Sequence, residues 1–223
     1  MDKQELINII DYTLLRPTAT KQEIKTFCEE TIEYGFKTVF VNPYYVSYAH
    51  NLLSTHGIKV GVPIGFSLGG ATTFVKVEET KEAIKNGAEE IDMLVNLGAL
   101  KSGDYDVVKD DIAAVVRAAN GLTTKVIIET ALLTDEEKVK ATELIIEAGA
   151  DFVKTATGFN GGGATVEDVQ LLHKTANGKI KVKAAGGVKT YEDAVKIVEA
   201  GATRIGASGA VAIINGEVSN ASY

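Results

Sequence analysis

The sequence is poor in features that define several common protein classes. Its 223 residues include one cysteine, Cys28, so neither an intramolecular disulfide nor a cysteine-based zinc site can form. No apolar run reaches the ~18 residues of a membrane span, and the N-terminus has no basic segment followed by an apolar one. These absences predict a soluble protein of a reducing compartment, the cytoplasm, with no membrane partner.

Positive charge is also scarce. Lys and Arg number 23 against 30 Asp and Glu, which gives a formal net charge of −7 that repels phosphate backbones and argues against a nucleic-acid partner. The sequence contains no HExxH, no P-loop signature and no GxGxxG after a first strand, so we expect neither a metal nor an organic cofactor. The 45% of hydrophobic residues is ordinary and permits a sizeable core.

Short runs rich in Val and Ile alternate with longer amphipathic segments from end to end. Eight such runs are candidate strands, at residues 9–15, 38–42, 59–65, 90–96, 125–130, 151–156, 180–186 and 204–208. This alternation is typical of parallel βα units. Eight units of roughly 28 residues each predict a (β/α)8 TIM barrel, an α/β fold.

Helix boundaries are legible between the candidate strands. Thr134 precedes three acidic residues, and Thr165 precedes Glu167 and Asp168, which is typical of capped helix N-termini. Glycines that suit helix C-termini precede the even-numbered strands, at Gly35, Gly87, Gly149 and Gly201.

The alternative is an open doubly wound sheet, whose central strands are covered on both faces and are nearly all apolar. Here the strands alternate instead: Glu90 and Asp92 share one face of their strand, as do Lys181 and Lys183. A barrel accommodates such a charged face in its lumen, where both signs of charge can pair. No linker splits the chain, so we expect one barrel domain, residues 1–215, and a short tail, 216–223.

Barrel active sites lie at the C-terminal ends of the strands. The polar side chains expected to point inward near those ends are Asp11, Asp92, Asn96, Glu129, Lys154 and Lys183. Buried lysines need partners, so one interpretation is a pair of structural salt bridges between these lysines and Asp92 or Glu129.

The other interpretation is a Schiff-base lysine. An ordinary lysine, with a pKa of about 10.4, is almost never neutral at pH 7, but burial beside a second ammonium can lower the pKa to about 7–8. Lys154 and Lys183 on adjacent strands provide this arrangement without a cofactor, and Asp92 could then move protons.

Glycine-rich turns follow the last three strands. Gly186 and Gly187 follow strand seven, with Lys189 nearby, and residues 206–209 follow strand eight; these are the two loops where barrels commonly bind a substrate phosphate. The loop from Thr157 to Gly163 after strand six is longer, and it is either a cover for a ligand or a plain flexible loop.

Several motifs together resemble the deoxyribose-phosphate aldolase family. They are DYTLLRP at 11–17, VNP at 41–43, EIDM at 90–93, KVIIET at 125–130, DFVKTATG at 151–158 and VKAAGG at 182–187. The resemblance covers essentially the whole chain in order, and the motifs of strands six and seven are specific.

The resemblance implies a class I aldolase that reversibly cleaves 2-deoxy-D-ribose 5-phosphate to D-glyceraldehyde 3-phosphate and acetaldehyde. It implies that Lys154 forms the Schiff base, that Lys183 perturbs the pKa of Lys154 and relays protons, and that Asp92 is the acid/base partner. Asp11 and Thr157 are possible accessory residues. The residues that match the family's phosphate site are Gly158, Gly186, Gly187, Gly206 and Ser208, with Lys189 and Gly209 beside them.

Four positions depart from the family pattern. Tyr12 replaces the usual histidine, Phe40 a frequent cysteine, Ser67 a proline and Gly209 a second serine. The change at Gly209 is expected to weaken phosphate binding by one hydroxyl contact, although the backbone N–H of Gly209 remains. The terminal Tyr223 is a candidate proton donor that folds back over the site; the alternative is a disordered end.

Two other functions remain open: a class I barrel aldolase with other carbonyl partners, or a non-catalytic barrel that binds a sugar phosphate. The oligomeric state is open between a monomer and a homodimer.

Overall fold

The computed structural model describes residues 1–221, and its sheet is a closed barrel of eight parallel strands in chain order. The barrel closes where β1 pairs with β8, Asp11 opposite Gly206. The strands are β1 (Ile10–Leu14), β2 (Thr38–Val41), β3 (Lys59–Ile64), β4 (Glu90–Leu94), β5 (Thr123–Ile127), β6 (Phe152–Lys154), β7 (Lys181–Ala185) and β8 (Arg204–Ala207). The predicted barrel is confirmed, and the open sheet is wrong.

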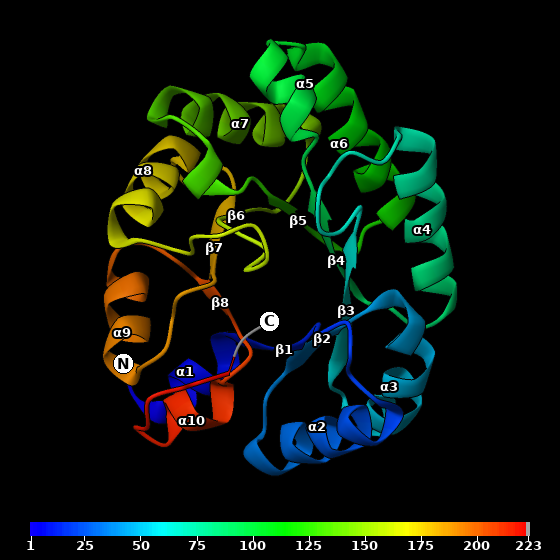
Figure 1. Ribbon diagram of the computed structural model, residues 1–223, viewed down its shortest axis with the longest axis vertical. Coiled ribbons are helices and arrows are strands. Elements are labelled where there is room, and N and C mark those ends of the chain that lie inside the picture. The colour runs from blue at the N-terminus through cyan, green and yellow to red at the C-terminus, as the bar shows by residue number, and fades with distance from the viewer. Residues whose placement is uncertain (222–223) are drawn as a thin grey trace.

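Helices form a ring around the barrel (Figure 1). They are α1 (Lys3–Ile9), α2 (Lys21–Tyr34), α3 (Val46–Leu53), α4 (Thr73–Lys85), α5 (Leu97–Ser102), α6 (Tyr105–Ala119), α7 (Asp135–Ala148), α8 (Val166–Ala176), α9 (Tyr191–Glu199) and α10 (Ala210–Ile214), with 3-10 turns η1 (Pro43–Tyr45), η2 (Ser54–His56) and η3 (Thr130–Leu132). Among residues 1–221, no helix has the length and apolar character needed to cross a membrane.

The predicted helix boundaries are confirmed. Thr134 caps α7 in a reciprocal capping box with Glu137, and the Thr165 hydroxyl accepts a hydrogen bond from the backbone N–H of Asp168 at the start of α8. The glycines expected after α2, α4, α7 and α9 all have positive φ, which an L side chain rarely adopts.

The fifth strand differs from its prediction. It starts two residues earlier and ends at Ile127, because Glu129 adopts a left-handed backbone with φ of 54° and cannot continue a strand. The left-handed turn directs Glu129 toward the loop after β6, where its carboxylate accepts the Thr157 N–H at 2.7 Å.

The strands divide their side chains between two environments. One apolar layer packs against the helices and includes Val39, Val60, Ile91, Val126, Val153, Val182 and Ile205, all buried. Burying side chains of this size contributes about 1.5–3 kcal/mol each relative to exposure. The alternate positions point into the lumen, where the polar and charged residues meet.

Candidate active site

The two predicted lysines converge on one carboxylate in the lumen. Lys154 is the last residue of β6, and the sheet register pairs it with Lys183 of β7. Both ammonium groups donate to Oδ2 of Asp92 on β4, Lys154 at 2.8 Å and Lys183 at 2.7 Å. The structure thus brings the side chains of the three proposed catalytic residues together in the lumen.

A second set of charges lies around this group. The Nζ of Lys125 on β5 donates to Asp92 Oδ1 at 3.0 Å and to Glu90 Oε2 at 2.5 Å. Arg204 of β8 contacts both Glu90, at 2.9 Å, and Asp11. Asp11 in turn lies 2.5 Å from the Nζ of Lys183.

Sequence reasoning placed Glu90 on the charged face of its strand but confined the site to strand ends, and therefore left Glu90, Lys125 and Arg204 out of the candidate site. Two of them could have been found from the alternation of side chains along a strand. Glu90 lies two residues before Asp92, and Lys125 lies two residues before Ile127, so each side chain points to the same face of its strand as that later residue. The pairing across β4 and β5 then sets Lys125 directly opposite Asp92.

Two carboxylates of this cluster, those of Asp92 and Asp11, are held in their ionised forms. Burial raises the pKa of Asp92, but the ammonium groups of Lys125, Lys154 and Lys183 outweigh burial and bring that pKa well below its ordinary value. The pKa of Asp11 is lowered in the same way: burial raises it, but the neighbouring cations, of which Lys183 has the largest effect, outweigh burial.

The environment of Lys183 favours its uncharged form. Burial lowers its pKa to about 8, although Asp11 and Asp92 act to raise it, and the neighbouring Lys154 and Lys125 lower it further. In Lys125 burial is outweighed by Asp92 and the other two carboxylates, so its pKa is raised. Lys183 therefore exchanges its proton near neutral pH, whereas Lys125 keeps its charge.

The balance of basic and acidic side chains in the cluster favours one neutral amine. Four basic side chains, Lys125, Lys154, Lys183 and Arg204, face three carboxylates, Asp11, Glu90 and Asp92. With every group ionised the cluster carries one excess positive charge, and loss of one lysine proton makes it neutral. A buried excess charge is costly, so this arrangement promotes the loss of that proton.

The phenyl ring of Phe40 on β2 lies against three of these ammonium groups. Its centroid is 3.9 Å from the Nζ of Lys183, 4.7 Å from that of Lys125 and 5.7 Å from that of Lys154. Space for the ring exists because the neighbouring strand has Gly61, where an added Cβ would lie 2.3 Å from the ring. The departure at Phe40 thus fills the lumen with a ring whose face attracts cations.

Tyr12, another departure, lies outside the lumen. Its hydroxyl donates to Glu30 at 2.8 Å, and its ring centroid lies 4.3 Å from that of Phe27 and 5.1 Å from that of Phe36. Burial and the hydrogen bond to Glu30 raise the pKa of the Tyr12 hydroxyl. Tyr12 is a packing residue between β1 and α2.

The loop after β6 is tied across the mouth of the barrel. The Nδ2 of Asn160 donates to the Ser67 carbonyl at 2.7 Å and to Glu129 at 3.3 Å, and the rings of Phe66 and Phe159 meet edge to face. These contacts join it to the loop after β3, which favours the interpretation of this loop as a cover for a ligand. Glu129, a possible lysine partner, instead serves this loop.

The glycine-rich turns enclose a small cavity of about 270 Å³. Lining residues include the predicted Gly158, Gly186, Gly187, Lys189, Gly206 and Ser208, together with Ser219, Asn220 and Ala221 from the chain end. No acidic side chain lines it among residues 1–221. Backbone N–H groups, hydroxyls and one lysine, without a carboxylate, suit an anion such as phosphate. Gly209 lies beside this cavity, against Ser219, and Tyr223 lies outside the described residues.

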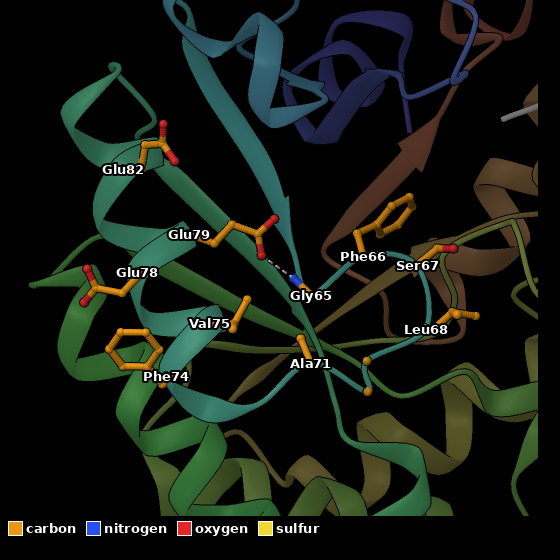
Figure 2. A pocket seen from close by; sticks show the side chains of 12 residues that line it. Gly65, Phe66, Ser67, Leu68, Ala71, Phe74, Val75, Glu78, Glu79 and Glu82 are labelled. Carbon is orange, nitrogen blue, oxygen red and sulfur yellow. Dashed lines mark hydrogen bonds between the residues drawn. The ribbon is translucent and has the colours of Figure 1, made fainter.

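A larger cavity than this one lies elsewhere. A groove of about 1060 Å³ runs between α4 and the loop after β3, and Figure 2 shows Phe74, Val75 and the acidic side chains of α4 along it. The dashed line in Figure 2 is the hydrogen bond from Gly65 N–H to Glu79. The groove contains none of the lumen lysines, so its size does not make it the reaction site.

Comparison with known proteins agrees with this geometry. The DeoC/LacD family aldolase model matches residues 6–215. The chain is 72% identical, over the full length of both proteins, to Deoxyribose-phosphate aldolase 2 of Oceanobacillus iheyensis, and 56% identical to the Deoxyribose-phosphate aldolase of Staphylococcus haemolyticus over 96% of this chain and 97% of the relative. A solved structure described as the unique tetrameric structure of deoxyribose phosphate aldolase from Aeropyrum pernix superposes with a TM-score of 0.89 at 33% identity, over 96% of this chain and 90% of that one.

Proposed function

Because the chain belongs to the DeoC/LacD family of aldolases, we propose that it reversibly cleaves 2-deoxy-D-ribose 5-phosphate to D-glyceraldehyde 3-phosphate and acetaldehyde through a lysine Schiff base. The observation that carries the proposal is the sharing of Asp92 Oδ2 by Lys154 and Lys183, at 2.8 and 2.7 Å, inside the barrel. Two amines on one carboxylate supply a nucleophile and a proton relay at the same point.

Lys154 is the nucleophile of this proposal. Its side chain is 8% exposed, against 1% for Lys183 and 0% for Lys125, so it is the most accessible of the three lumen lysines. It also ends its strand, at the barrel face where reactions take place in this fold.

Lys183 acts as the proton relay. With a pKa of about 8, roughly 10% of Lys183 is neutral at pH 7, compared with about 0.04% for an ordinary lysine. It therefore accepts a proton from Lys154 or returns one through Asp92, which contacts both amines.

The reaction begins when the neutral Lys154 amine attacks the C1 aldehyde of the open-chain sugar phosphate. Loss of water gives a protonated imine, which accepts the electron pair of the C2–C3 bond while the C3 hydroxyl loses its proton and becomes the aldehyde of glyceraldehyde 3-phosphate. The enamine left on Lys154 takes a proton at C2, and water then releases acetaldehyde and the free amine.

The substrate phosphate binds in the cavity lined by Gly158, Gly186, Gly187 and Ser208, with Lys189 as the cation. Absence of acidic side chains among the described lining residues supports this assignment. Asp11 has a supporting role, because its carboxylate is the closest anion to Lys183.

Self-association as a homodimer is a further part of the proposal. The Aeropyrum pernix relative is described as tetrameric, and here Leu68 and Phe74 expose about three quarters of their surface beside the α4 groove. Sedimentation velocity of the purified protein tests it. A reducing compartment such as the cytoplasm suits the chain, since Cys28 is buried and has no second cysteine to pair with.

The proposal is tested by borohydride reduction in the presence of acetaldehyde, followed by intact mass measurement and peptide mapping. We expect one ethyl adduct, confined to Lys154 and absent from Lys154→Leu. Lys181→Leu is the matched control, because Lys181 lies on the same strand as Lys183 but is exposed at the other end of the barrel, and it should be labelled like the wild type. An unlabelled wild type, or label mainly on other lysines, would favour structural salt bridges instead.

A further inference from the structure

The end of the chain occupies a space that Gly209 leaves open. A Cβ added to Gly209 would lie 1.6 Å from the Oγ of Ser219 and 2.4 Å from its Cβ. The backbone of Gly209 has a φ of −101°, which any residue adopts, so the need for glycine here comes from the close approach of Ser219.

The segment after α10 is fixed in this position by hydrogen bonds. In Figure 1 the red segment that follows α10 turns back toward the centre of the barrel. The Ser219 N–H donates to the Lys189 carbonyl at 2.8 Å, and Ala221 N–H donates to the Ser219 Oγ at 3.2 Å. Ser219 is only 5% exposed.

This placement carries Ser219 into the small cavity. Ser219 and Asn220 form part of its lining, together with Gly187 and Ser208. The Ser219 oxygen already accepts from Ala221, and within residues 1–221 no acceptor takes its hydroxyl proton. A hydroxyl in that state can donate to an anion in the cavity.

We propose that Ser219 is a ligand of the substrate phosphate, delivered by the chain end to the place where a side chain at position 209 would otherwise lie. The inference rests on the proposed function, since it assigns the phosphate of that substrate to this cavity. The Gly209 departure then costs no hydroxyl contact, because the hydroxyl comes from Ser219 instead.

One consequence is a coupling between phosphate binding and the position of the chain end. If Ser219 contacts the phosphate only when the segment is docked, bound phosphate stabilises the docked segment, and the docked segment strengthens phosphate binding by the same factor. Substrates without a phosphate gain nothing from this contact.

The test compares kcat/KM for 2-deoxyribose 5-phosphate with kcat/KM for 2-deoxyribose in each variant, so that the ratio reports only what the phosphate adds. Ser219→Ala keeps the Cβ that packs on Gly209 and removes the hydroxyl. We expect this ratio to fall about tenfold or more, as for loss of a hydrogen bond to a charged group.

A reciprocal exchange tests the geometry. Gly209→Ser alone collides with Ser219 and should lower the ratio, whereas Gly209→Ser combined with Ser219→Gly removes the collision and restores a hydroxyl, so the ratio should recover to within about threefold of the wild type. Circular dichroism and thermal unfolding establish that each variant is folded.

A Ser219→Ala ratio within twofold of the wild type would overturn the inference, as would equal losses on both substrates, which indicate a packing role. Failure of the proposed function looks different, because the wild type itself would then cleave neither substrate and would form no borohydride adduct.

Discussion

Replacing Phe40 with trifluorophenylalanine keeps the ring in place and withdraws electron density from its faces, which weakens its attraction for cations. The ring centroid lies 3.9 Å from the Nζ of Lys183, well inside the ~6 Å range of a cation–π contact. Such a contact contributes about 0.5–1 kcal/mol when exposed and about 2 when desolvated, and one pKa unit corresponds to about 1.36 kcal/mol.

Loss of this contact disfavours the charged ammonium, so the pKa of Lys183 should fall below its value of about 8. The expected decrease is about 0.5–1.5 units, with a smaller decrease for monofluorophenylalanine. A carbon-13 NMR titration of the lysine Cε signals measures it directly, with Lys183 assigned by the signal lost in Lys183→Arg. The pH dependence of kcat/KM should move in the same direction.

The control is the same substitution at Phe36, which is also fully buried but has Tyr12 and Tyr34 as its ring neighbours. It should leave the Lys183 titration in place. If trifluorophenylalanine at position 40 moves the Lys183 titration no more than it does at position 36, the ring acts only by excluding water, and the electrostatic role given to Phe40 is refuted.

Two further predictions concern stability. Lys76→Met should lower the free energy of unfolding by about 3–5 kcal/mol, because it leaves the buried carboxylate of Asp111, which lies 2.5 Å from the Lys76 Nζ, without a cation. The double variant with Asp111→Leu should recover most of that loss. Urea unfolding of both variants checks this. Acid should also destabilise the fold: the pKa values of Asp11 and Asp92 are lowered on folding, so their contribution is present above the ordinary value of 3.8 and is lost as pH falls through the lowered values. Urea unfolding from pH 6 to pH 2 should show this decline, and a flat profile below about pH 4 would contradict it.

The barrel and the central lysines could be predicted because the information is local. In β7, Lys183 lies between Val182 and Ala184, and this alternation assigns it to the lumen without knowledge of any other strand. The rule that barrel sites lie at strand ends then selects Lys154 and Asp92, and the register that pairs Lys154 with Lys183 follows from adjacent parallel strands.

The remaining parts of the site depend on contacts that no local pattern encodes. Arg204 reaches Asp11 across 193 residues of sequence because the closing pair β1–β8 brings them together. Phe40 fits only because Gly61 stands beside it on the next strand. Each of these contacts requires the stagger of the closed barrel, which alternation within single strands does not determine.

The charged side chains of the lumen are accommodated because each of them pairs with a charge of the opposite sign. A buried ionic cluster contributes little to stability, since apolar replacements of similar volume are often neutral or stabilising by about 1–4 kcal/mol. Lys125 and Arg204 nevertheless belong to the same cluster as Lys154 and Lys183, and their pKa values are raised, so that their charges are fixed. Both help to hold Asp11 ionised, Lys125 does the same for Asp92, and Lys125 also helps to lower the pKa of Lys183. On the proposed function, the fixed charges of Lys125 and Arg204 have a reason: they help to keep ionised the carboxylates beside Lys154 and Lys183, which apolar side chains in their places would not do.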